Sequence, residues 1–547
     1  MTRTFGTRLY EKTWETLLKR IVTCTVAVVV LVAGAVTADR LISAARSCAG
    51  GVTESGDECI GVNGSGYDWG VREIRPVVDR IKEENDRIDE PGSAYVTVAM
   101  MLPLQPESKA EKEQLRSELQ GAYLAQYRAN REEGAPKVRL VLANPGRDYA
   151  KQDEVVPDLV RMSRSTEHRL RAVTGFNLSL DSTRAAIRDL TEEHVPVLVA
   201  RASASSLANE EGRKARFDGL ARILPTNEDQ ARALADYNGS RRNDDTAVLQ
   251  DTRPDAYVRS LADAFQRLEK DEEGPKGPAT MDFESPGIAV EGDVDNQLRP
   301  WVNTICVSGV NTVYFAGRST HLRLFLLRLA KDSCGHRRFT VVSGSDAASL
   351  KNKMSGDDWA QLLGEDGRPK MTVQYAAPAH PAAWDTEVER WRQAEERRTG
   401  HKPDAARAPG SLRDPQRELH ALTKSAREAG DIGPWEDLLD DSRTMMVHDG
   451  VRTAIEAIRG AKPTGATAPS LEQVGNRWPV MQANNRVDGT SGRICLTSAG
   501  NPYNKPLAVV ELQPPDEKGP RSSWLKYVGM AWPLGKKQAE DCVVRGG

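Results

Sequence analysis

The chain carries seven cysteines, and six of them fall into three pairs that are close together in sequence. An even number of thiols in an oxidising compartment predicts a disulfide framework, although sequence alone leaves the connectivity open. Buried free thiols are the alternative. No Cys-x-x-Cys motif and no histidine–cysteine cluster with zinc spacing occurs, so we predict neither a metal site nor a cofactor. The predicted bridges join Cys48 to Cys59, Cys306 to Cys334 and Cys495 to Cys542.

Sequence patterns that build a catalytic site are absent. There is no Gly-x-Ser-x-Gly elbow, no His-Glu-x-x-His helix and no Walker phosphate loop, and the eight histidines are dispersed. His448 and Asp449 are adjacent, but they lie at the start of an expected helix, where capping is the commoner role. A net charge of −3 over 547 residues gives no sign of nucleic-acid binding. We therefore predict a protein that is not an enzyme and that binds no nucleic acid.

An uninterrupted apolar run occupies residues 21–38 and is just long enough to cross a bilayer core. Five basic residues precede it, so the positive-inside rule places residues 1–20 in the cytoplasm and the bulk of the chain outside. We expect an uncleaved signal anchor, which makes the chain a single-pass protein of the cell membrane. A signal peptide cut after Ala38 is the alternative, and it would also export the chain.

Beyond residue 93 the sequence alternates between short apolar, β-branched runs and amphipathic segments of helical period. Repeats of this kind predict an α/β fold, with parallel sheets covered by helices on both faces. The expected strands are 95–102, 138–143, 170–174, 195–200, 246–250, 311–316 and 338–342. The expected helices are 109–129, 155–163, 182–193, 257–270 and 322–331.

Several motifs along this pattern resemble one known family. Residues 173–183 (VTGFNLSLDST) and 194–205 (HVPVLVARASAS) are similar to the first and second ligand loops of the type I periplasmic-binding proteins. That family includes the branched-chain amino-acid binding proteins of ABC transporters. Further similar segments follow in the same order, and together they cover residues 94–534. They are 220–227, 246–265, 447–458 and 488–494.

The resemblance implies two doubly wound parallel-sheet lobes joined by a hinge, preceded by the transmembrane helix. Residues 39–93 are then an extracytoplasmic linker that holds the Cys48–Cys59 loop. We predict residues 94–203 and 346–485 as lobe 1, and residues 204–345 and 486–535 as lobe 2. Residues 536–547 form a C-terminal tail.

The resemblance also implies where a ligand binds, because both lobes turn the carboxyl ends of their strands towards a shared cleft. In the amino-acid binders, hydroxyls and amides at these positions take the ligand carboxylate. Capping, loop and packing roles are the structural alternatives for these residues. The implied ligand-binding residues are Ser179, Ser203, Ala204, Ser205 and Tyr257.

One turn departs from the pattern of the amino-acid binders. Those proteins hold the ligand ammonium with an acidic residue after the strand that corresponds to residues 313–317, whereas the turn here reads Arg318-Ser-Thr-His. The ammonium group of an amino acid would therefore have no carboxylate partner in this turn, which is costly in a desolvated cleft. We therefore add Arg318 to the predicted ligand-binding residues, as a partner for an anionic group.

The predicted function is that of an extracytoplasmic solute-binding protein. It would capture a small ligand, an amino acid or an anion-bearing solute, by hinge closure and deliver it to an ABC permease. One alternative is a membrane-anchored ligand-sensing receptor domain that acts through a membrane signalling partner. The other is a cell-envelope interaction protein with no small ligand.

Overall fold

A computed structural model describes residues 48–88, 94–133, 136–239, 246–268, 279–331, 334, 337–363, 369–461, 468–513 and 524–544. The chain divides into two compact units, Met1–Cys59 and Ile60–Gly547. The described part of the first unit contains β1 (Val52–Ser55) and the predicted Cys48–Cys59 disulfide. The predicted membrane span at 21–38 lies outside the described residues. Within the described ranges, no helix has both the length and the apolarity to cross a bilayer.

The first lobe of the second unit is built on a largely parallel sheet. From β2 onward its strand order is β2-β4-β3-β5-β6-β7, and only β2 runs antiparallel to its neighbour, β4. The five parallel strands are buried almost throughout, as their β-branched sequences predict. The strands are β2 (Glu58–Asn63), β3 (Tyr95–Met101), β4 (Lys137–Asn144), β5 (Leu170–Gly175), β6 (Val197–Val199) and β7 (Leu220–Arg222).

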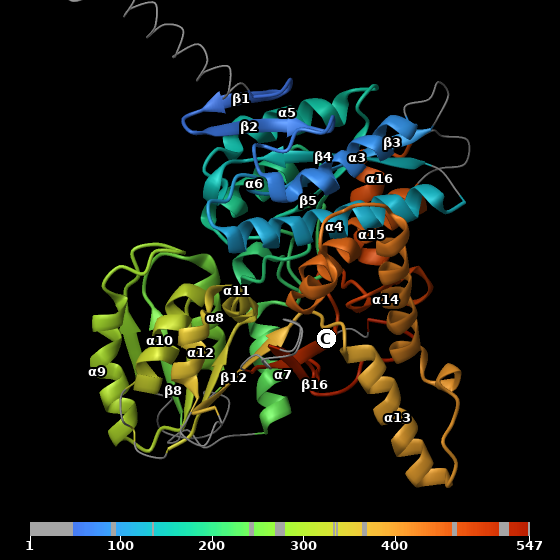
Figure 1. The fold of residues 1–547 in the computed structure, drawn as a ribbon. Helices are drawn as coiled ribbons and strands as arrows, with labels where there is room; N and C mark the ends of the chain where they lie inside the picture. The colour runs from blue at the N-terminus through green and yellow to red at the C-terminus, as the bar shows by residue number, and fades with distance from the viewer. Residues whose placement is uncertain are drawn as a thin grey trace, which may run out of the picture. The chain divides into compact units, whose positions relative to one another are not determined.

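Helices cover this sheet, and two of them come from opposite ends of the chain. α4 (Lys109–Arg131) and α15 (Arg443–Ala461) lie side by side (Figure 1). They approach closely at Gly121, where any side chain would overlap the Thr444 carbonyl. The Thr444 hydroxyl donates a hydrogen bond to the Ser117 carbonyl at 3.0 Å. The other helices of the lobe are α3 (Arg75–Ile88), α5 (Gln152–Arg164), α6 (Asp181–Glu192) and α16 (Leu471–Gly475).

The second lobe has a seven-stranded sheet in the order β16-β15-β12-β11-β10-β8-β9. The five strands from β9 to β12 are parallel, and β15 and β16 add an antiparallel edge. The strands are β8 (Thr246–Asp251), β9 (Ala279–Phe283), β10 (Thr312–Ala316), β11 (Phe339–Ser343), β12 (Met371–Ala377), β15 (Leu507–Leu512) and β16 (Leu525–Ala531). The helices are α7 (Asn227–Asn238), α8 (Ala256–Arg267), α9 (Val294–Val307), α10 (Ser319–Lys331), α11 (Leu350–Lys353) and α12 (Gly356–Leu362).

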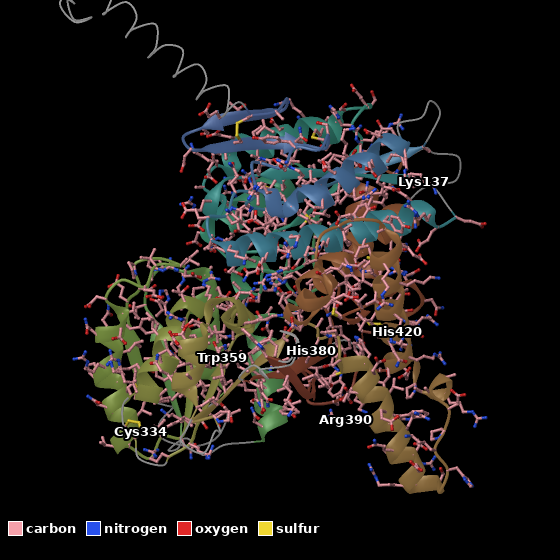
Figure 2. All side chains as sticks on the ribbon, viewed as in Figure 1. Lys137, Cys334, Trp359, His380, Arg390 and His420 are labelled. Atoms are coloured by element: carbon pink, nitrogen blue, oxygen red, sulfur yellow. A yellow bond between two sulfur atoms is a disulfide. The ribbon has the colours of Figure 1, made fainter. Side chains whose placement is uncertain are left out.

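The two other predicted disulfides are present as well. Cys306 in α9 is bonded to Cys334, which follows α10 and is labelled in Figure 2. Cys495 is bonded to Cys542, which ties the C-terminal segment to the chain just after a two-stranded hairpin. That hairpin is formed by β13 (Val487–Gly489) and β14 (Gly492–Ile494).

The predicted α/β architecture of two doubly wound lobes is confirmed, but the lobe boundaries lie elsewhere. β7 belongs to the first sheet, whereas the sequence predicts residues 204–345 as lobe 2. β12 belongs to the second sheet, although residues 346–485 were assigned to lobe 1. In each case the strand pairs in parallel with the strand before it in sequence, so the chain stays in one lobe for one strand longer than predicted.

The chain therefore crosses between the lobes after β7, after β12 and before β15. The middle crossing leads into two long helices, α13 (Ala383–Thr399) and α14 (Gly410–Glu428), before α15 returns to the first sheet. The β13–β14 hairpin precedes the last crossing, so the return to lobe 2 comes after the predicted position of 486.

Candidate ligand-binding cleft

A cavity of 460 Å³ lies where the carboxyl ends of the parallel strands of both lobes meet. Its volume falls within the range of small-molecule sites. Lobe 1 contributes the loops after β3, β5 and β6 and the start of α4, and lobe 2 contributes Tyr257 of α8, residues 287–290 and the loops after β10 and β11. The crossings contribute Leu224, Pro378, Asp441 and Ser442, and the start of α15 contributes Arg443 and Met446.

Four of the six predicted ligand-binding residues line this cavity. Ser179 and Ser203 come from lobe 1, and Tyr257 and Arg318 come from lobe 2. Residues more than 130 positions apart in the chain are thus brought to one site, as the resemblance implies.

Ala204 and Ser205 are not part of the cavity lining. Ala204 is fully buried, and its carbonyl accepts a hydrogen bond from Arg222 Nη1 at 3.0 Å. The amide of Ser205 donates to Ser260 Oγ of α8 at 3.0 Å, so this residue joins the two lobes beside the cavity. The loop after β6 turns away from the cavity after Ser203, which the sequence motif did not reveal.

Ser179 performs a different task from the one predicted. Its hydroxyl oxygen accepts hydrogen bonds from the amides of Ser203 and Ala204, both at 3.1 Å. Only 3% of Ser179 is exposed. The two amides that the resemblance offers to a ligand carboxylate are therefore already bonded to the protein's own hydroxyl.

Arg318 is buried and paired with a carboxylate. Its guanidinium donates to both oxygens of Asp255, at 2.8 and 2.9 Å, and lies 4.6 Å from the centre of the Tyr257 ring. Burial lowers the pKa of Arg318, but the negative charges of Asp255 and Asp346 together outweigh burial and raise it above the usual value. Asp255 also accepts from the Tyr257 amide at 2.9 Å and so caps α8. Arg318 lines the cavity, but its charge is already balanced.

The turn at 318–321 has no carboxylate, but the loop after the next strand, β11, brings one to the cavity. Asp346, in the short helix η5 (Ser345–Ser349) after β11, lines the cavity and accepts from the Ser319 amide at 2.8 Å. Burial raises the pKa of Asp346, but the nearby positive charges of Arg318 and Lys353 hold it below its usual value. The amide of Asp346 in turn donates to the Tyr257 hydroxyl at 3.2 Å. β10 and β11 are adjacent parallel strands, so the loops at their carboxyl ends lie at the same site. The expected strands 311–316 and 338–342 are consecutive in the sequence, and this order is the feature that could have indicated Asp346.

A buried cluster of charged residues on the lobe 1 side was not predicted. Glu118 of α4 is 3% exposed and accepts from Asn177 Nδ2 at 2.9 Å. Its Oε1 atom lies 3.3 Å from Arg201 Nε and 3.8 Å from Arg443 Nε. Arg443 also donates to Asp441 Oδ2 at 2.9 Å. The sequence feature that could have indicated this cluster is Glu118, a carboxylate among the apolar positions of the expected helix 109–129.

Burial dominates the electrostatics of this cluster. It raises the pKa of Glu118, although Arg201 and Arg443 oppose the shift. It lowers the pKa of Arg201 to about 10, with the charge of Arg443 acting in the same direction. Both groups therefore carry a desolvation cost that a suitable ligand can reduce.

No family model matches the chain, and a search of curated proteins also finds no match. Solved structures do match. A leucine-binding protein from Thermotoga maritima has a TM-score of 0.51 at 15% identity, over 80% of this chain and 98% of its own. An ABC transporter substrate-binding protein from Aeropyrum pernix has a TM-score of 0.54 at 15% identity, over 82% of this chain and 97% of its own.

A third solved structure is a solute-binding protein of an ABC transporter from R. palustris, in complex with 4-hydroxybenzoate. Its TM-score is 0.52 at 13% identity, over 80% of this chain and 96% of its own. Identities this low establish a shared fold. The resemblance to type I periplasmic-binding proteins, proposed from sequence motifs, is confirmed at that level.

Proposed function

We propose that this protein captures a small solute between its two lobes by hinge closure and serves an ABC-type transporter. The observation that carries the proposal is the cavity of 460 Å³, which both lobes line with loops at the carboxyl ends of their parallel strands. Solved solute-binding proteins of ABC transporters share the fold. The proposed role is binding, not catalysis.

Closure requires that the ligand bind the closed form more tightly than the open form. The cavity offers this difference, because polar groups of lobe 1, such as Arg201, face polar groups of lobe 2, such as Asp346. Contacts that already join the lobes beside it include Ser205 with Ser260, Asp181 with Arg259 at 3.6 Å and Arg443 with Ser349 at 3.0 Å. The three crossings supply the hinge.

The location proposed for this activity is the outer face of a cell membrane, with residues 21–38 as the anchor. The apolar run and its basic flank support it, as do three disulfides in a chain with no free cysteine among the described residues. An uncleaved anchor also favours a second candidate, a fixed sensor domain that reports ligand to a membrane partner. N-terminal sequencing of the mature protein tests whether the run is retained.

Thermal unfolding with a panel of solutes tests the binding function. The panel contains L-leucine, 4-hydroxybenzoate, acidic amino acids, dipeptides and neutral sugars. A ligand at 100 times its Kd adds about 2.7 kcal/mol to the free energy of unfolding, which raises Tm by several degrees. We expect at least one solute to do so.

A variant with a blocked cavity provides the control. Ala289 lies on an exposed loop that lines the cavity, so Ala289→Trp fills space without disturbing the core. Ala394→Trp places the same side chain on the exposed surface of α13. The shift should disappear in the first variant and remain in the second. A panel without any effect on the unmodified protein would contradict the proposal and favour an interaction protein with no small ligand.

A further inference from the structure

Arg201 occupies an unusual position in the cavity. It follows β6 after one residue and lines the cavity together with Ser203. Its side chain is 17% exposed, and its Nε atom is buried without a hydrogen-bond partner. Its one ion pair to a described residue is the 3.3 Å approach to Glu118. A guanidinium has five donor hydrogens, and no described residue accepts a hydrogen bond from this one.

The other arginines of the cavity are committed to protein partners. Arg318 donates to Asp255, Arg443 donates to Asp441 and Ser349, and Arg147 donates to Glu107. Lys353, the remaining cationic residue, donates to Thr320 Oγ1 at 2.5 Å. Among the described residues that line the cavity, Arg201 is thus the arginine whose guanidinium donates no hydrogen bond to a described residue.

Glu118 does not use those donors. One of its oxygens accepts from Asn177, and the other lies between two guanidiniums at 3.3 and 3.8 Å. The Nε donor is buried without an acceptor, which costs free energy, so the site favours a ligand that supplies acceptors to this guanidinium. Two parallel acceptor oxygens, as in a carboxylate, match the guanidinium best.

The charge of the cavity restricts the ligand further. Its lining contains five cationic side chains against six carboxyl groups, so it is unsuited to a polyanion. The cationic residues are Arg147, Arg201, Arg318, Lys353 and Arg443, and the acidic residues are Glu107, Glu111, Glu118, Asp148, Asp346 and Asp441. A single anionic group is what Arg201 can accommodate.

We propose that Arg201 is the residue that selects the ligand, by holding the carboxylate of a small monocarboxylic acid in two N–H···O bonds. This inference rests on the proposed solute-binding function. It replaces the serine–amide cradle implied by the sequence motif, since Ser179 already occupies the amides of that cradle.

Pairs of acids and their neutral amides test the inference on the full chain. The probes are 4-hydroxybenzoate with 4-hydroxybenzamide, L-leucine with L-leucinamide, and inorganic phosphate, measured by calorimetry and thermal shift. We expect an acid to bind while its amide and phosphate do not. Arg201→Gln should weaken acid binding by about 10- to 100-fold, the value of one charged hydrogen-bonded contact.

Matched variants separate this role from a structural one. Arg188→Gln removes an exposed lobe 1 arginine that pairs with Asp189 outside the cavity lining, and it should leave acid binding within about twofold. Because Arg201→Gln leaves Glu118 buried beside one cation fewer, the double variant Glu118→Gln/Arg201→Gln restores the charge balance and should show the same loss. Glu118→Gln alone should bind the acid at least as tightly.

Each other outcome has a distinct meaning. Three results would overturn the inference and leave the solute-binding function standing. They are equal binding of the acids to Arg201→Gln, binding of the amides as tight as that of the acids, and binding of phosphate in place of the acids. Binding of neutral solutes alone would do the same. If no member of these probes or of the larger panel binds the unmodified protein, both the inference and the proposed function fall.

Discussion

Two clusters of buried charged residues in this protein differ in how completely their central carboxylates are hydrogen-bonded. The Asp449 cluster joins α4, α15 and the turn of the β13–β14 hairpin, and consists of Arg128, His448, Asp449, Thr490 and Ser491. Both oxygens of its carboxylate are satisfied. Oδ1 accepts from the Thr490 amide at 2.9 Å and from its hydroxyl at 3.0 Å, and Oδ2 accepts from the Ser491 amide at 2.7 Å and from its hydroxyl at 2.5 Å.

His448 completes this cluster in a defined protonation state. Its Nε2 atom lies 3.1 Å from Arg128 Nη1, and a guanidinium can only donate, so Nε2 accepts. The imidazole proton is therefore on Nδ1, which donates to Asp449 Oδ1 at 3.0 Å. Burial raises the pKa of Asp449, but the hydrogen bonds from His448 and Ser491 outweigh it and hold the pKa at about 2.

The cavity cluster (Glu118, Asn177, Arg201, Asp441 and Arg443) is left incomplete. Its central carboxylate has one hydrogen bond, from Asn177, and two guanidiniums at longer range. Burial raises the pKa of Glu118, the opposite of the net shift at Asp449. The contrast teaches that buried charge alone does not mark a functional site. What distinguishes the cavity cluster is buried charge with unused hydrogen-bonding capacity beside a cavity.

The largest predicted effect is the loss of the satisfied carboxylate. Asp449→Ala leaves His448 and four donors of Thr490 and Ser491 without their acceptor, and should lower the free energy of unfolding by about 3–5 kcal/mol. Urea unfolding measures it. Asp263→Ala, on the exposed face of α8, is the control and should change the value by less than about 0.5 kcal/mol. A loss below 1 kcal/mol for Asp449→Ala would remove the basis of the comparison.

Acid should destabilise the fold through its buried neutral histidines. His380, labelled in Figure 2 at the middle crossing, lies 2.7 Å from the Leu525 carbonyl through Nε2, and its Nδ1 accepts from the Ala382 amide. Burial lowers the pKa of His380 to about 4 and also lowers the pKa of His448. Both folded-state values lie below the unfolded value near 6.5, so this stability is present above pH 6.5 and is lost as pH falls towards 4.

The contribution of His380 is about 3 kcal/mol over that range. Urea unfolding at pH 7, 6, 5 and 4 measures it. His380→Gln should flatten part of the profile, because glutamine does not titrate. A free energy of unfolding that stays constant from pH 6.5 to 4.5 would show that these histidines are accessible to protons in the fold.

A smaller effect on the free energy of unfolding is expected at Lys505, and here too stability rises with pH. This residue is fully buried beside the Asp449 cluster, where its Nζ atom donates to the Ser491 carbonyl at 3.1 Å. Burial lowers its pKa to about 8, below the usual 10.5, so the charged form is disfavoured in the fold and stability rises between pH 8 and 10.5. Lys505→Met should stabilise the protein by about 2 kcal/mol at pH 7 and abolish that rise. Destabilisation by this variant would mean that the ammonium completes the cluster.

The smallest effect should be that of Glu118→Gln. An amide can keep the hydrogen bond from Asn177 Nδ2, and the carboxylate it replaces is poorly bonded, so the free energy of unfolding should change by less than about 1 kcal/mol. Urea unfolding beside Asp449→Asn, the same chemical change in the satisfied cluster, makes the comparison direct. Equal losses in the two variants would show that both clusters are structural.

Alternation of apolar strands with amphipathic helices predicts the α/β class, and three pairs of cysteines close in sequence predict the disulfides, because both are local patterns. The arrangement in two lobes is what the resemblance to the periplasmic-binding proteins implies. The sequence misplaced the lobe boundaries, since a parallel strand such as β7 or β12 has the same composition in either sheet. The residues around the cavity were partly predicted. Ser179 was placed there correctly, but its bonds to two amides depend on how the β5 and β6 loops meet in space.

The more informative cavity residues were missed for a related reason. Arg201 lies in the motif at 194–205, but the motif does not single it out, because an arginine after a strand is usually solvated. Asp346 belongs to a different loop from Arg318, and only the adjacency of β10 and β11 brings them together. Arg318 was predicted to face a ligand, whereas Asp255, 63 positions earlier, neutralises it.

The packing of α15 against α4 has a consequence for biosynthesis. The hydrogen bond from Thr444 to Ser117 joins residues 327 positions apart, so the apolar face of α4 leaves the ribosome long before its cover exists. At about 5–20 residues per second, the delay is roughly 15–65 s. Throughout that interval the nascent first sheet displays an unfinished surface, and during that time a holdase chaperone would protect it from aggregation.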